Sequence, residues 1–119
     1  MLRALARTIV AASMTAALFA CGSDSVTGPP VAGTVTATTD LHFTPQSITL
    51  SRSSGSAALT FTFQSTNHKV VWDTQPSGAA VEQLPSTHDA SVERQLSVAG
   101  TYTYHCPFHD GMTGTVIVE

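Results

Sequence analysis

The part of the sequence richest in potential ligands lies close to its C-terminus, at residues 104–112 (YHCPFHDGM). These nine residues contain one thiol, two imidazoles and one thioether. Thiolate sulfur, imidazole nitrogen and a weakly bound thioether suit copper rather than calcium or magnesium, and the usual blue-copper set contains two His, one Cys and a distant Met. His68, in a strand-like run, is a candidate for a further imidazole. The residue types therefore predict a small copper protein.

The N-terminal part of the chain has the build of a secretory signal peptide, which we place at residues 1–20. Arg3 and Arg7 precede an uncharged, Ala-rich run at residues 9–20. This run is too short for a comfortable membrane span. The alternative is a core helix, but the polar tract that follows disfavours it. The remaining chain is long enough for one domain.

Residues 18–22 (LFACG) resemble a bacterial lipoprotein cleavage site, in which the Cys becomes the lipidated first residue. We therefore expect lipidation of Cys21, an exported protein on the periplasmic or cell-envelope side, and attachment to a membrane through the lipid. Phe19 is bulkier than this pattern usually has. Ordinary cleavage that leaves a free Cys21 is the alternative.

Residues 21–33 (CGSDSVTGPPVAG) are rich in Gly, Ser and Pro and have no hydrophobic periodicity, which predicts a flexible tether. The folded unit is then residues 34–119, whose small core a bound metal would help to stabilise. Without residues 1–20, three basic residues stand against eight acidic ones, a net charge near −5 with His neutral. This charge argues against a nucleic-acid partner. A disulfide between Cys21 and Cys106 is disfavoured, because one lies at the processing site and the other among candidate ligands.

Short segments of alternating, β-branched or aromatic residues recur along the folded unit and predict an all-β antiparallel sandwich. The expected strands lie at residues 34–38, 41–50, 57–64, 68–73, 92–98, 101–106 and 114–118. In the fourth, His68, Val70 and Trp72 share one face. Ala99-Gly100 predicts a hairpin between the strands on either side of it. At most one helical turn is expected, between residues 78 and 84.

Three segments together resemble the cupredoxins, small blue-copper proteins with a Greek-key β-sandwich, and among them the plastocyanin and amicyanin-like group. They are FTP at residues 43–45 with the strand that follows, HKVVWD at residues 68–73, and GTYTYHCPFHDGMTGTV at residues 100–116. The third is highly specific, since Cys, His and Met follow one another at three-residue intervals. The resemblance covers most of residues 34–119.

The resemblance implies that His68, Cys106, His109 and Met112 bind one type 1 copper ion. It also implies a non-enzymatic carrier that shuttles single electrons between redox partner proteins through His109. Pro107, Phe108 and Met112 would then form part of a docking surface around this His. A monomer is expected.

Two positions depart from the family pattern. Many relatives have Asn directly after the first ligand His, and its side chain ties the two ligand loops together. This chain has Lys69 there, and Asn67 is a candidate to substitute for it. Pro107, after the Cys, has no N–H to donate. Some of the hydrogen bonds that tune the metal are therefore expected to be absent or replaced.

Two other functions stay open beside electron transfer. A copper carrier or buffer could deliver the metal to an oxidase, although such carriers more often use surface Met and His without a strand-end Cys. A component of a larger copper enzyme could hold a second copper at His105, as copper nitrite reductases do. Because His105 points to the face opposite Cys106, we expect it to be a surface residue.

Overall fold

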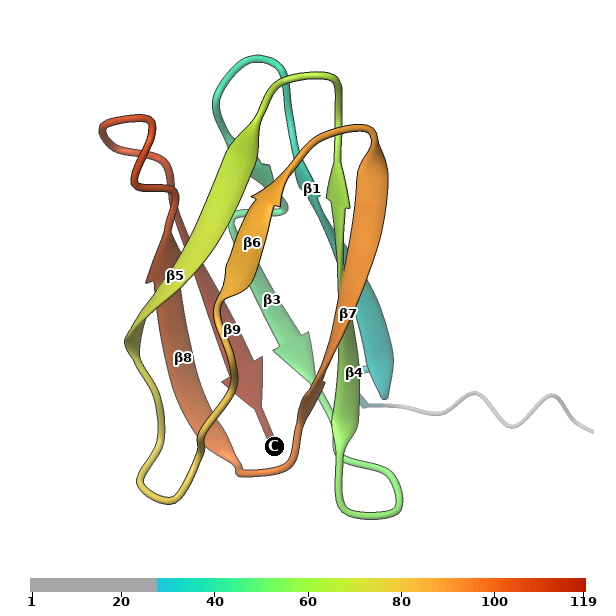
Figure 1. Cartoon of the computed structure of the whole chain (residues 1–119). Helices are drawn as coiled ribbons and strands as arrows, with labels where there is room; N and C mark the ends of the chain where they lie inside the picture. Colours follow the sequence, from blue (N-terminus) through green and yellow to red (C-terminus); the bar gives the residue numbers. More distant parts are fainter. Residues whose placement is uncertain (1–27) are drawn as a thin grey trace, which may run out of the picture.

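The structure is a computed structural model, and it describes residues 28–119, which form two packed sheets (Figure 1). The predicted signal peptide and the predicted lipidation site Cys21 lie outside these residues. One sheet has the order β2 (Phe43–Thr44), β1 (Ala32–Ala37), β4 (Ala57–Phe63) and β7 (Ala90–Leu96). The other has the order β3 (Ser47–Leu50), β9 (Thr113–Val118), β8 (Gly100–His105), β5 (His68–Thr74) and β6 (Leu84–Thr87). The predicted all-β sandwich is confirmed.

No helix in the described part of the chain is long and apolar enough to cross a membrane.

The alternation of apolar and polar residues explains why these strands form the two faces of a core. In β4 every second residue is buried, from Ala57 to Phe63, and in β5 the buried positions are His68, Val70 and Trp72. A strand turns successive side chains to opposite faces, so one face of each sheet packs inward. The face predicted for residues 68–73 is therefore confirmed.

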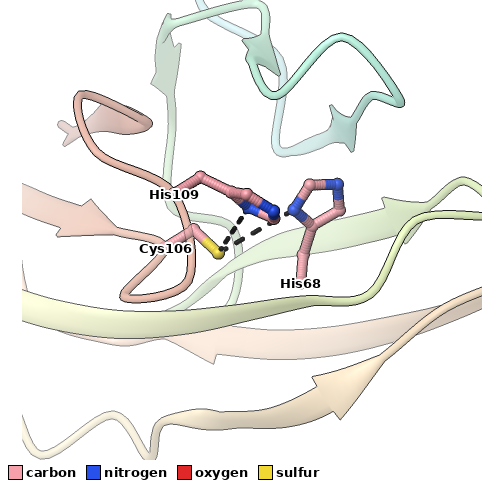
Figure 2. A group of neighbouring side chains, drawn as sticks. All are labelled: His68, Cys106 and His109. Atoms are coloured by element: carbon pink, nitrogen blue, oxygen red, sulfur yellow. Dashed lines mark hydrogen bonds between the residues drawn. The ribbon is translucent and has the colours of Figure 1, made fainter.

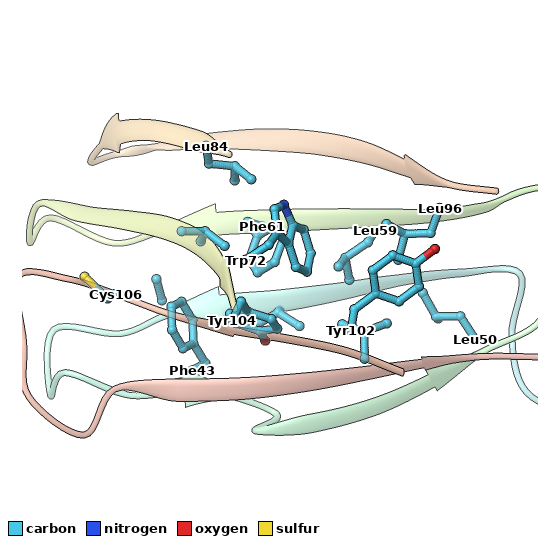
Figure 3. Packing of buried hydrophobic residues seen from close by; sticks show 14 of the residues in the cluster. Phe43, Leu50, Leu59, Phe61, Trp72, Leu84, Leu96, Tyr102, Tyr104 and Cys106 are labelled. Carbon is cyan, nitrogen blue, oxygen red and sulfur yellow. The ribbon is translucent and has the colours of Figure 1, made fainter. Parts of the chain in front are cut away.

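Phe61 lies at the centre of the aromatic part of the core (Figure 3). Its ring is perpendicular to that of Tyr104, at a centroid distance of 5.2 Å, and it also contacts Trp72 at 6.1 Å and Phe43 at 6.3 Å. Edge-to-face pairs at these distances are favourable beyond the area that they bury. Burial raises the pKa of Tyr104, whose hydroxyl has no hydrogen-bond partner in the described part of the chain.

Two strand pairs are parallel, whereas the sequence predicted antiparallel pairing. β1 pairs in parallel with β4, and β3 pairs in parallel with β9. Parallel neighbours need a crossover connection. Here the chain leaves the first sheet after β2, enters the second sheet as β3 and returns as β4. β3 therefore lies in a different sheet from β2 and β4, its neighbours in the sequence.

The prediction of a hairpin at Ala99-Gly100 was wrong. β7 and β8 belong to different sheets, so the chain crosses the core between them. Both strands carry buried apolar residues, Leu96 on β7 and Tyr102 on β8, which must face one another across the sandwich. Gly100 has a φ of 140°, and a Cβ there would lie 2.7 Å from the ring of Pro76.

The helical turn considered for residues 78–84 is absent, and β6 was not predicted. The backbone groups of this segment instead bind side chains. Gln75 exchanges two hydrogen bonds with the backbone of Val81, of 2.8 and 3.1 Å, and Trp72 Nε1 donates to Glu82 O at 3.0 Å. Arg94 donates to Glu82 O at 3.1 Å. Backbone groups need hydrogen-bond partners, and here side chains provide them in place of a helix.

Gly114 on β9 allows Tyr104 to lie against the backbone of the neighbouring strand. The two residues are partners across β8 and β9, and a Cβ on Gly114 would overlap the Tyr104 ring. We expect Gly114→Ala to lower the free energy of unfolding by about 1–3 kcal/mol, the usual cost of overpacking a core. Urea unfolding of the metal-free protein measures this change. Gly28→Ala is the matched control, since no atom lies within 4 Å of its added Cβ. Equal stabilities of the two variants would contradict the prediction.

Candidate metal centre

The predicted ligands meet at one end of the sandwich, although they come from separate strands. His68 is the first residue of β5, and Cys106 directly follows β8. His109 and Met112 lie on the loop between β8 and β9. β5 and β8 are neighbours in one sheet, with Val71 opposite His105, so their ligand-bearing ends lie side by side.

Three of the four predicted ligands have their donor atoms close together (Figure 2). The sulfur of Cys106 lies 3.5 Å from Nδ1 of His109 and 3.8 Å from Nδ1 of His68. Figure 2 shows both imidazole rings directed toward this sulfur. His68 and Cys106 are buried, whereas His109 is partly exposed. This cluster joins a thiol and two imidazoles at the edge of the core.

The distances fit three ligands of a single metal ion. Metal–nitrogen bonds of about 2.0 Å and metal–sulfur bonds of about 2.3 Å, at trigonal to tetrahedral angles, place the ligand atoms about 3.5–3.7 Å apart. Met112 is buried and lines the same hollow of about 420 Å³ as Cys106 and His109. The donor set of His68, Cys106, His109 and Met112 is the combination typical of a type 1 copper site.

Backbone hydrogen bonds fix the ligand loop. Cys106 N donates to Met112 O at 2.9 Å, His109 N to Cys106 O at 3.3 Å, and Met112 N to His109 O at 3.3 Å. Gly111 has a φ of 76°, in the left-handed region that glycine adopts without strain. The three-residue spacing read from the sequence therefore corresponds to two successive turns that return Met112 to Cys106.

A backbone carbonyl orients His68, a contact that residue types alone did not indicate. Nε2 of His68 lies 2.9 Å from Thr38 O, in the loop after β1. Since a carbonyl can only accept, Nε2 carries the proton and Nδ1 keeps its lone pair for a metal, an arrangement typical of metal-binding His. Burial lowers the pKa of His68, and the nearby His109 lowers it further, while the bond to Thr38 opposes both effects. Burial is the largest of these effects, so the neutral imidazole is favoured.

A backbone group of Lys69 contacts one of the predicted ligands. Lys69 N donates to the sulfur of Cys106 at 3.5 Å, which joins the two ligand-bearing strands. Asn67, considered as a substitute, has an exposed side chain that forms no hydrogen bond to the described residues. A hydrogen bond to the sulfur is one of the contacts that tune a copper site.

His105 lies on the outer face of its sheet, as predicted, and is 37% exposed there. Its Nδ1 lies 2.6 Å from the Asp73 carboxylate, an interaction that the sequence did not indicate. Asp73 sits at an irregularity in the pairing of β5 with β8, where a bulge redirects side chains. Within the described residues, the cluster that could hold a metal consists of His68, Cys106 and His109, and His105 is not part of it.

The metal-free protein is expected to lose stability as the pH falls below about 6.5, the pKa of an unperturbed His. Because the folded pKa of His68 is lowered, the unfolded chain binds more protons in this range. The free energy of unfolding then falls by at most about 1.4 kcal/mol per pH unit for this residue, until the pH passes its folded pKa. Urea unfolding between about pH 8 and pH 5 measures the slope. His68→Gln should reduce it, and an unchanged slope in that variant would contradict the prediction.

Comparisons with known proteins agree with this site and fold. The family model of copper-binding proteins of the plastocyanin/azurin family matches residues 31–119. The solved structure of a reduced Cu(I) form of an amicyanin mutant has a TM-score of 0.61 at 23% identity, over 74% of this chain and 82% of the other. A mutant plastocyanin of a fern has a TM-score of 0.59 at 27% identity, over 73% of this chain and 100% of the other. The comparison with curated proteins gave no match.

The two-sheet sandwich and the His-Cys-His-Met set thus define a cupredoxin with a type 1 copper site. The chain belongs to the plastocyanin/azurin family of copper-binding proteins.

Proposed function

We propose that this protein is an exported type 1 copper electron carrier, bound to a membrane through a lipid on Cys21, that shuttles single electrons between redox proteins. The observation that supports it most is the position of the Cys106 sulfur, within 3.8 Å of Nδ1 of both His68 and His109. Bound copper would supply a one-electron couple between Cu(II) and Cu(I). His68, Cys106, His109 and Met112 would hold it.

The protein restricts how far these ligands can move, which favours fast electron transfer. Three backbone hydrogen bonds hold the loop from Cys106 to Met112, and Thr38 holds the His68 ring. Ligands fixed by a packed scaffold keep nearly the same arrangement in both oxidation states. Little reorganisation is then needed when an electron arrives or leaves.

His109 is the proposed exit for the electron, since its ring is partly exposed whereas His68 is fully buried. Pro107 is exposed, and Phe108 is 52% exposed, so apolar surface adjoins the ring. Met112 was expected to contribute to this surface, but it does not, because only 1% of it is exposed. A partner that docks on Pro107 and Phe108 would approach the ligand His109 directly.

Copper(II) titration of the protein, followed by visible absorption and ascorbate, tests the function. The carrier should develop an intense blue band that saturates near one copper per chain and bleaches reversibly. Tight binding without that band would contradict the proposal and favour a copper carrier. A second copper shared between chains would instead favour an enzyme component with a metal at His105.

A further inference from the structure

The chain enters the domain at a fixed point, which lies away from the metal site. Ser51 N donates to Pro30 O at 2.8 Å, and Ala58 N donates to Val31 O at 3.0 Å. These bonds attach the start of the described chain to the ends of β3 and β4 that are far from the ligands. Arg52 N donates to Glu119 O at 3.0 Å, so the C-terminal residue lies at this end as well. We call it the tether end.

The loop between β8 and β9, which carries three of the predicted ligands, lies at the opposite end of the sandwich (Figure 1). β1 begins at Ala32, beside the tether end, and is followed by Thr38, whose carbonyl contacts His68. β9 also runs from one end of the sandwich to the other, because it begins directly after Met112 and ends one residue before the C-terminus. Eight residues separate Pro30 from Thr38, and at about 3.3 Å per residue they span about 26 Å.

The chain between the lipid and the domain is short compared with this distance. Nine residues separate Cys21 from Pro30, and nine residues reach at most about 32 Å when fully extended. To bring the copper end onto the bilayer, these residues would have to run back along the domain over about 26 Å. They would then be almost fully extended and would lose most of their backbone freedom, which is unfavourable.

The charged residues at the ligand end also disfavour contact between this end and the bilayer. Asp40 and Asp110 are exposed in the loops at the ligand end, and Asp89 is exposed in the turn that contacts Gln64 there. Membrane surfaces that contain anionic lipids attract basic segments, so acidic loops are not attracted to them. Neither chain length nor charge favours contact between the ligand end and lipid.

We propose that on the lipid-anchored protein the exposed edge at His109 faces away from the bilayer and serves a water-soluble redox protein. With the tether end next to the lipid headgroups, the docking site of this partner would lie about 25 Å from them. This inference rests on the proposed function, including the lipid on Cys21. It excludes a partner whose electron-accepting group is reached at the membrane surface.

Energy transfer from two labelled positions to the bilayer tests this orientation. The full-length lipidated protein, with reduced copper bound, is placed on phosphatidylcholine vesicles that carry rhodamine on their headgroups. A fluorophore is attached to Ser53→Cys, near the tether end, or to the matched Ser65→Cys, near the ligand end; both serines are exposed. Because β4 places the two sites about 20 Å apart, transfer should be at least about twofold more efficient from position 53. Deleting residues 23–27 should leave transfer more efficient from position 53 than from position 65.

Equal transfer from both positions, or more efficient transfer from position 65, would overturn the proposed orientation. A protein that stays in solution would overturn both the lipid anchor and the orientation. Neither result depends on the blue band, which tests electron transfer separately. Failure of the orientation is therefore distinguishable from failure of the electron-carrier function.

Discussion

Replacing Cys106 by serine is expected to abolish the intense visible absorption of the copper-loaded protein completely. The band depends on charge transfer from a thiolate to copper(II), and Cys106 provides the sulfur 3.5–3.8 Å from the two imidazoles. Copper affinity should fall by more than the roughly 10–100-fold that is typical when only a partner of a ligand is removed. Titration with copper(II), followed by absorption and by a competing chelator, measures both effects.

The matched control for this substitution is His105→Gln. His105 directly precedes Cys106 but lies on the outer face, where it contacts Asp73. This variant should keep the blue band and the stoichiometry of one copper per chain. A band that survives in Cys106→Ser, or that disappears in His105→Gln, would show that the ligands have been assigned incorrectly. Circular dichroism of both metal-free variants confirms that they are folded.

Replacing Phe61 by alanine is expected to lower the free energy of unfolding by about 3–5 kcal/mol, the usual cost of removing a buried aromatic ring. Phe61 has no exposed surface and packs against Phe43, Trp72 and Tyr104. These neighbours come from both sheets, so they cannot close the cavity without moving the sheets relative to one another. Since small domains are only marginally stable, this loss is a large fraction of the total. Urea unfolding of the metal-free protein measures it.

Phe108→Ala is the control for this prediction, since it removes the same ring from an exposed position. Its effect on stability should stay within about 0.5 kcal/mol. The same variant should slow electron exchange with a docked protein if Phe108 contributes to the proposed surface. Comparable losses of stability in both variants would contradict the assignment of Phe61 to the centre of the core.

Local spacing explains why much of the site could be predicted. Cys106, His109 and Met112 lie within seven residues, so one tight loop can bring them together, and their side-chain chemistry already indicates copper. Strand alternation likewise placed His68 on the buried face of its strand. These features depend on residues that are close in sequence, for which residue type and period are sufficient.

The tertiary structure alone decided how distant segments meet. The chain crosses to the other sheet between β7 and β8, and β1 pairs in parallel with β4, because both sheets must bury their apolar faces against each other. Thr38 and Lys69 act on the site through backbone groups that every non-proline residue carries, so their types give no signal. The sequence by itself determined the ligands and the class of fold. The packing of the two sheets decided which strands are neighbours, which backbone groups hold the ligands, and at which end of the domain the site lies.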